Sequence, residues 1–167
     1  QDLPNPEVEV EAEPVPDSVL LVRRLIVGFQ FPGGLVDVVN GVDLRIDRSE
    51  TLAVIGESGS GKSVTAASIM GILPSPPARI KAEAITVDGR NLLALSRSER
   101  RKMRGREMSL VLQDSLASLN PVKTVGSQIA EMFTTHLGTS RRDAKDRAVE
   151  LLDRVGIASP RARFDRY

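Results

Sequence analysis

Residues 56–63, Gly-Glu-Ser-Gly-Ser-Gly-Lys-Ser, have the residue types and the spacing of a phosphate-binding loop. They fit the pattern G-x-x-x-x-G-K-[ST] at each fixed position. Glycines let consecutive backbone N–H groups turn toward phosphate oxygens, and a helix that starts after them adds its positive dipole end. Lys62 can bind the β- and γ-phosphates of a nucleotide, and the Ser63 hydroxyl can ligate Mg²⁺. The loop therefore predicts binding of a nucleoside triphosphate.

The segments on either side of this loop have the character that the motif requires. Residues 50–55 form a short apolar run, typical of a buried parallel strand. Residues 62–71 contain Ala66, Ala67, Ile69 and Met70 and predict a helix. A chance match in a glycine-containing turn would lack this strand–loop–helix context.

The composition excludes several other classes of function. The 167 residues suggest one domain or part of a larger one, and 41% hydrophobic residues are enough for a core. A net charge of +1 gives no drive toward nucleic acid, and the absence of cysteine excludes thiol catalysis and Cys-based metal sites. No apolar run has the length of a transmembrane helix and no signal peptide opens the chain, so we expect a soluble, cytoplasmic protein.

The N-terminal half of the chain predicts a tail followed by strands. Residues 1–17 hold four prolines, six acidic residues and no basic residue, which predicts a disordered tail; an acidic interaction arm is the alternative. Residues 19–31 and 36–46 are two β-rich runs joined by Pro-Gly-Gly and predict a hairpin. Further strands are expected at 82–87 and 108–112.

Helices are expected in the rest of the chain. Residues 96–106 carry six basic residues, which favour a solvated helix face over an anion site. After Pro121, Thr124 can cap one helix and Ser140 a second, which Gly156 would end. His136, the only histidine, is interpreted as a surface or capping residue.

A second motif narrows the nucleotide-binding family. Gln113 follows an apolar run 51 residues after Lys62, and Ser-Leu-Asn-Pro follows at 118–121. This arrangement resembles the Q-loop of ATP-binding cassette (ABC) ATPases. More narrowly, residues 56–65 and 113–121 resemble the ATP-binding subunits of oligopeptide and dipeptide importers, as do residues 104–109 and 124–129. The similarity runs from Val19 to the C-terminus, with Ser49 and Ser115 standing where the family usually has glycine and proline.

The resemblance implies an α/β fold, with an ABC-type P-loop core in residues 18–120, which includes a β-rich N-terminal subdomain. It also implies the first part of a helical subdomain in 121–167, so the domain would be incomplete. Lys62 and Gln113 would be catalytic, and Ser63 and Gln113 would contact Mg²⁺. Phe29 would stack on adenine, although Phe31 and ordinary core packing remain open as alternatives. The implied nucleotide-binding residues are Phe29, Gly56, Ser58, Gly59, Ser60, Gly61, Lys62, Ser63 and Val64.

The same resemblance implies ATP and Mg²⁺ as cofactors and ATP hydrolysis that powers peptide import. The implied partners are transmembrane permease subunits, a second ATP-binding subunit and, indirectly, a solute-binding protein, with no nucleic acid. The implied location is the cytoplasmic face of a bacterial membrane, where the protein would be peripheral.

The 167 residues contain neither the Leu-Ser-Gly-Gly signature of this family nor a Walker B strand. We therefore expect this chain to supply one phosphate-binding half-site. By itself it should bind nucleotide weakly or not at all and hydrolyse almost none.

Three other functions remain as alternatives. A GTPase would use the D-x-x-G match at residues 153–156, but the chain has no N-K-x-D base-recognition motif. A small P-loop kinase would use the arginines of residues 97–106 as a phosphate lid. A non-enzymatic, truncated fragment would self-associate through exposed sheet edges.

Overall fold

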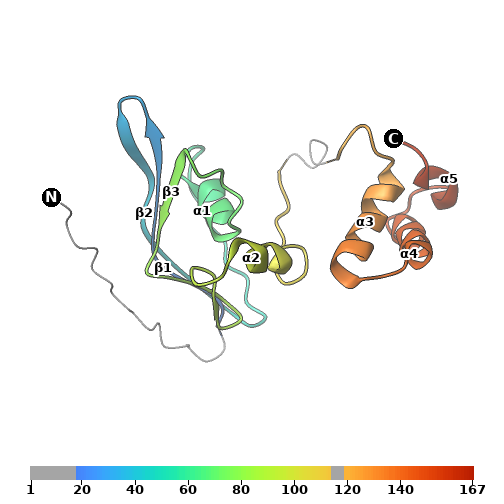
Figure 1. The fold of residues 1–167 in the computed structure, drawn as a ribbon, viewed down its shortest axis with the longest axis horizontal. Coiled ribbons are helices and arrows are strands. Elements are labelled where there is room, and N and C mark those ends of the chain that lie inside the picture. Colours follow the sequence, from blue (N-terminus) through green and yellow to red (C-terminus); the bar gives the residue numbers. More distant parts are fainter. Residues whose placement is uncertain (1–17, 114–118) are drawn as a thin grey trace. The chain divides into compact units, whose positions relative to one another are not determined.

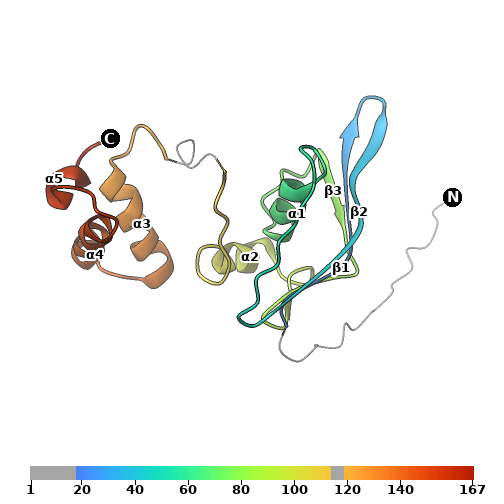
Figure 2. The same cartoon turned by 180° about the vertical axis from the view of Figure 1, so that it is seen from behind.

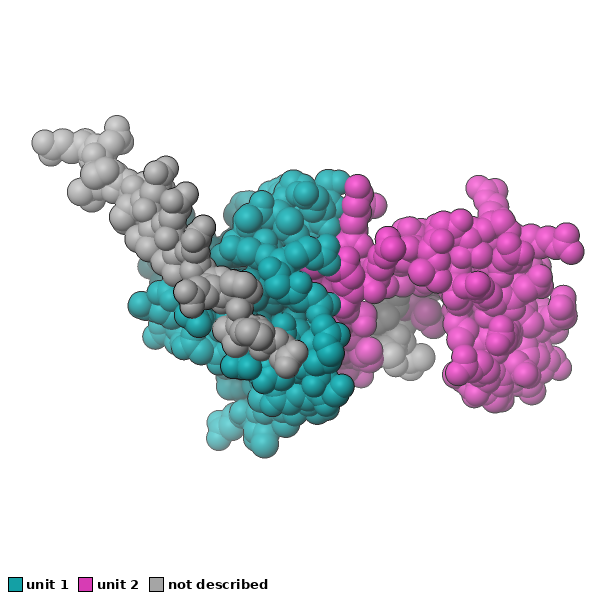
Figure 3. Space-filling model, turned by 90° about the horizontal axis from the view of Figure 1, so that it is seen from below, with its two compact units in different colours: residues 1–100 teal, residues 101–167 magenta. Residues whose placement is uncertain are grey.

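The computed structural model of this chain describes residues 18–113 and 119–167. It divides into two compact units, Gln1–Arg100 and Arg101–Tyr167, which Figure 3 colours separately. Each unit is described on its own below. The predicted tail at 1–17 and residues 114–118 of the predicted Q-loop lie outside the described residues.

The first unit is built on a long antiparallel hairpin of β1 (Ser18–Phe31) and β2 (Gly34–Asp47), seen in blue in Figure 1. The hairpin predicted from the two β-rich runs is confirmed. Its turn lies at Pro32 and Gly33, and Phe31 is paired with Gly34. Val22, Leu25 and Val27 of β1 are fully buried and form the centre of this unit's core.

The other side of β1 pairs with two short strands in succession. β4 (Ala84–Val87) pairs with Leu20 to Arg23, and β3 (Ala78–Lys81) pairs with Ile26 to Phe29, both antiparallel. The single strand predicted at 82–87 is thus wrong in its extent, because the pairing is interrupted opposite Arg24, whose φ of 48° breaks the regular strand. Asp43 accepts a hydrogen bond from Arg24 N at 2.8 Å, and Glu83 forms a 3.1 Å ion pair with its guanidinium.

A last strand and one helix complete the first unit. β5 (Arg90–Asn91) pairs with β4 after the predicted Asp-Gly turn, which gives the sheet order β2-β1-β4-β5. α1 (Lys62–Ile69) follows the glycine loop and packs against β1 and β2 (Figures 1 and 2). Of the predicted strand–loop–helix order, the helix forms where expected, whereas the strand does not.

Two predicted strands do not form. Residues 51–57 and 109–112 have no assigned secondary structure, and the apolar side chains in them are exposed, reaching 93% at Ile55 and 88% at Val111. A parallel strand needs hydrogen-bonded neighbours on its edges, and no strand among the described residues pairs with either segment. Apolar composition alone therefore predicted two strands, but neither segment has a partner strand among the described residues.

The second unit is helical. α2 (Arg97–Met103) spans the point of division, and α3 (Val125–Leu137), α4 (Arg141–Arg154) and α5 (Pro160–Phe164) follow. Both predicted N-caps are confirmed: Thr124 accepts from Ser127 N, and Ser140 accepts from Asp143 N. Gly156, with φ of 78°, ends α4 as predicted, because the left-handed conformation is accessible to glycine without strain.

α3, α4 and α5 pack against one another around the Phe164 ring. Ala144, Ala148 and Leu152 bury one face of α4, as their spacing predicts. Val125 N donates to Arg166 O at 2.8 Å, which ties residues beyond α5 to the start of α3. Among the described residues, no helix is both long enough and apolar enough to cross a membrane.

Candidate nucleotide site

The glycine loop is shaped by close contact with β2. Gly61 is buried and has φ of 90°, and a Cβ at this position would lie 3.0 Å from Val38 O and 3.3 Å from Val39 Cγ2. A side chain would therefore both strain the backbone and lift the loop off the strand. A Cβ on Gly56 would lie 2.7 Å from Ser60 Oγ, so that hydroxyl would have to turn away.

The Lys62 ammonium folds back onto this loop. Its Nζ donates to Gly56 O at 2.7 Å, to Glu57 O at 2.6 Å and to Ser60 Oγ at 3.3 Å. An ammonium has three donors, and all three meet neutral oxygen acceptors. Negatively charged phosphate oxygens bind such a donor more strongly than neutral carbonyls do. The cation is thus held where it can exchange its loop acceptors for an anion.

The start of α1 adds further donors beside the lysine. Thr65 N donates to Gly61 O at 2.8 Å and is the first N–H of the helical ladder. The N–H groups of Lys62, Ser63 and Val64 precede it and have no partner within the helix. The first turn contains no acidic residue, so nothing there opposes an anion. The Ser63 side chain is exposed on the same turn.

Eight of the nine predicted nucleotide-binding residues therefore come together at one junction. They are Gly56, Ser58, Gly59, Ser60, Gly61, Lys62, Ser63 and Val64. The ninth, Phe29, lies on β1 and is half-buried, opposite Val36 of β2 and Ala78 of β3. Val27 of β1 is paired with Val39, which the loop contacts through Gly61, so Phe29 lies a short way along the same sheet.

In the full-length protein, we expect Phe29→Leu to weaken MgATP binding by about 10-fold, because base–aromatic stacking contributes about 1–3 kcal/mol. Leucine keeps the position apolar and spares the sheet. Phe31→Leu is the matched control, since Phe31 is 53% exposed beside the hairpin turn. Fluorescence titration with a labelled ATP analogue measures both, and a larger loss in Phe31→Leu would transfer the stacking role to Phe31.

Gln113 belongs to the second unit and is exposed at the end of the unpaired segment 109–112. The glycine loop belongs to the first unit, so the role of Gln113 at that loop stays a prediction. Of the Q-loop residues that follow, Leu119, Asn120 and Pro121 are described. His136 occupies the last turn of α3 and is half-buried against Gly105, where a Cβ would lie 2.5 Å from Nε2. The expected surface or capping role of His136 did not include this packing contact.

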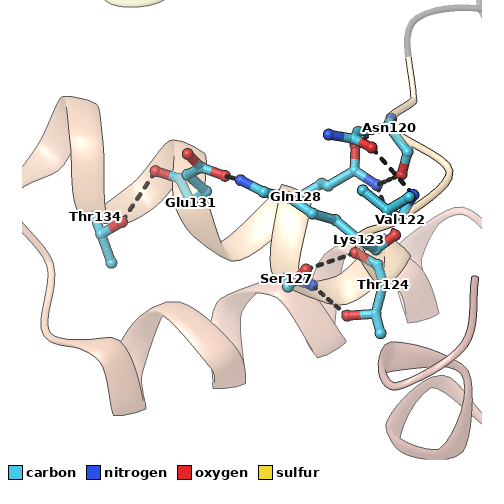
Figure 4. Close-up of polar contacts among 8 residues, drawn as sticks. All are labelled: Asn120, Val122, Lys123, Thr124, Ser127, Gln128, Glu131 and Thr134. Carbon is cyan, nitrogen blue, oxygen red and sulfur yellow. Dashed lines mark hydrogen bonds and ion pairs between the residues drawn. The ribbon is translucent and has the colours of Figure 1, made fainter.

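Sequence reasoning also missed a polar network that fixes the turn before α3 (Figure 4). Gln128 Nε2 donates to Asn120 O and to Lys123 O, both at 3.0 Å, and Gln128 Oε1 accepts from Asn120 N at 2.8 Å. Lys123 and Glu131 form a 2.7 Å ion pair beside it. Asn-Pro at the turn was the available signal, because such dipeptides mark turn starts.

A groove of about 570 Å³ runs along this turn and one face of α3. Its apolar part includes the exposed side chains of Leu119 and Met132, and its polar part includes Lys123 and Glu131. Among the described residues, no group of three or more His, Asp or Glu side chains could hold a metal ion.

Comparison with known proteins assigns the family. A family model described as ABC transporter matches residues 39–166. The oligopeptide transport ATP-binding protein OppD of Bacillus subtilis is 44% identical over 149 residues, which cover 89% of this chain and 42% of that protein. The dipeptide transport ATP-binding protein DppD of the same organism is 40% identical over 151 residues, covering 90% and 45%. The chain thus spans about half the length of the curated relatives it matches.

A solved structure agrees on the fold. It is the dimeric, post-hydrolysis ATP-binding cassette MJ0796 bound to ADP and Pi, with a TM-score of 0.72 and 19% sequence identity. The match covers 89% of this chain and 60% of that one, so the chain contains part of an ABC-type domain, as the resemblance implied. With a phosphate-loop junction, an ABC-type fold and a family match over most of its length, this chain belongs to the ABC transporter family.

Proposed function

We propose that this chain is the N-terminal part of an ATP-binding subunit that powers the import of oligopeptides or dipeptides by ATP hydrolysis. The observation that carries the proposal is the junction of loop and α1, where Lys62 and unpaired N–H groups converge. The names of the relatives, which are peptide transport proteins, support the peptide class.

The residues at the junction fit ATP. The loop holds neutral acceptors against Lys62, its glycines leave the backbone accessible, and the first turn of α1 offers donors without a carboxylate. Lys62 would bind the β- and γ-phosphates, and backbone N–H groups from Gly59 to Val64 would line them. Bound ATP would supply the free energy, through transfer of its γ-phosphoryl group to water.

The Ser63 hydroxyl fits Mg²⁺ as a single neutral oxygen ligand, because this ion retains several waters and takes phosphate oxygens as further ligands. We assign Gln113 to the orientation of the attacking water or to a contact with the metal ion. Its position after the unpaired segment 109–112 makes it a residue that other parts of the transporter can move. The division into a core of 18–120 and a helical part of 121–167 is part of the same proposal.

The groove beside α3 is the surface that we assign to the transmembrane permease. It combines exposed apolar side chains, including Met132 at 50%, with the Lys123–Glu131 ion pair. Such a mixture of apolar and charged side chains is typical of protein interfaces. A second ATP-binding subunit would complete the nucleotide site, and the protein would lie at the cytoplasmic face of the membrane.

The rival functions have less support. Residues 153–156, the D-x-x-G match, form the end of α4, where Gly156 N donates to Asp153 O at 2.9 Å. Their glycine is explained as a helix terminator rather than as a phosphate ligand. The family match favours an ABC ATPase over a small kinase or a non-enzymatic fragment.

The full-length protein, co-expressed with its permease subunits in membrane vesicles, tests the proposal. We expect ATP hydrolysis to increase when the solute-binding protein is loaded with a peptide, with uptake of that labelled peptide. GTP in place of ATP, and an amino acid or sugar in place of the peptide, are the controls. Stimulation by a non-peptide solute alone would overturn the peptide assignment, and absence of any Lys62-dependent hydrolysis would overturn the ATPase itself.

A further inference from the structure

α2 carries four cationic side chains that make no ion pair with any described residue. They are Arg97, Arg100, Arg101 and Lys102. Three of them are exposed and Arg100 is half-buried. The helix contains one acidic residue, Glu99, whose carboxylate accepts a hydrogen bond from Ser96 N at 2.8 Å. A short helix with this excess of positive charge attracts an anionic partner.

The cations are also regularly spaced along the helix. Arg97, Arg100 and Arg101 are three and four residues apart, so they share one face. Arg97 and Arg101 are separated by about 6 Å along the axis, at a rise of about 1.5 Å per residue. Like charges at this spacing repel each other, and a ligand with carboxylates at a similar interval would relieve the repulsion.

Residues 1–17 have the complementary charge pattern. They contain six acidic residues and no basic one, and four of the acids occupy alternate positions at Glu7, Glu9, Glu11 and Glu13. In an extended peptide, residues two apart project to the same side at intervals of about 6.6 Å. Carboxylates at this interval match the separation of Arg97 and Arg101.

The connection between the two segments is short enough for them to meet. Val19 O accepts a hydrogen bond from Asp88 N at 2.9 Å, so the start of β1 lies at the turn between β4 and β5. α2 begins nine residues after Asp88, which limits its distance from that turn to about 30 Å. The 17 residues before Ser18 can span about 56 Å. The length of residues 1–17 therefore allows this segment to reach α2.

We propose that the acidic segment 1–17 binds the cationic face of α2 as an intramolecular arm. Tethering raises the effective concentration of the segment to the millimolar range, which lets several weak ion pairs act together. The arm would compete with other anions for α2. Since the pairs are exposed to solvent, the interaction must weaken as salt shortens the screening length from about 10 Å at 0.1 M to about 3 Å at 1 M.

The absence of cysteine allows a direct test on the 167-residue chain. Ala12→Cys, labelled with a nitroxide, places a paramagnetic centre between Glu11 and Glu13. We expect the amide NMR signals of α2 to lose at least half their intensity at about 0.05 M salt and to recover at about 1 M, following the screening length. Replacing the six acids by Asn and Gln should abolish the loss at low salt.

Two charge-removing variants locate the site. Arg97→Gln with Arg101→Gln should reduce the broadening, whereas Arg141→Gln with Arg142→Gln, which removes two exposed cations from α4, should leave it unchanged. Equal broadening of all basic helices would overturn the proposal. So would unchanged α2 signals together with binding of α2 to phosphatidylserine vesicles, which would make a lipid headgroup the occupant.

Discussion

Lys62→Ala is expected to lower the ATPase rate of the full-length protein by about 100- to 1,000-fold, the range found when one preorganised donor to a reacting anion is removed. The Nζ has three acceptors, all within the loop, so its removal takes the positive charge of Lys62 away from the loop. Single-turnover hydrolysis and equilibrium binding of MgATP separate lost chemistry from lost affinity.

Lys81→Ala is the matched control, because Lys81 is an exposed lysine of the same unit, on β3. Its variant should hydrolyse ATP at the unaltered rate. Circular dichroism should show both variants folded, since the hydrogen bonds of the Lys62 Nζ all lie within the loop. A Lys62→Ala protein with at least half of the original rate would contradict the role assigned to the loop.

The junction of the glycine loop and α1 was predictable because its information is local. The eight residues of the loop carry their motif within one short segment, and the Thr124 and Ser140 caps depend on residues three positions away. The hairpin was predictable for the same reason, since its strands are adjacent in sequence and joined by a Pro-Gly turn. Each of these features can be recognised from residues that are close together in sequence.

The wrong and missing predictions concern contacts between segments that are distant in sequence. Residues 50–55 and 108–112 are apolar enough for buried strands, yet a strand exists only when another strand pairs with it. The interruption between β3 and β4 follows from the conformation of Arg24 in β1, more than fifty residues earlier. The contact of His136 with Gly105 likewise joins segments that are distant in sequence. Local composition cannot contain such pairings.

Gly126 is the position where a long-range contact yields the largest expected loss of stability. It is buried in the first turn of α3, and a Cβ there would lie 2.2 Å from two ring carbons of Phe164 and 2.6 Å from its carbonyl oxygen. We expect Gly126→Ala to destabilise the packing of α3, α4 and α5 by about 2 kcal/mol, because forced overpacking of a core costs about 1–3 kcal/mol. Amide hydrogen exchange in α4 should then accelerate by about 30-fold.

The sign of this effect is the decisive result. Alanine is favoured over glycine inside a helix by up to about 1 kcal/mol, so a variant free of the clash would be more stable. Slower exchange in Gly126→Ala would therefore contradict the contact with Phe164. Gly33→Ala is the control, since a Cβ at Gly33 meets no atom within 4 Å. Adding Phe164→Leu to Gly126→Ala should restore part of the protection, because it removes the ring but leaves the backbone contact.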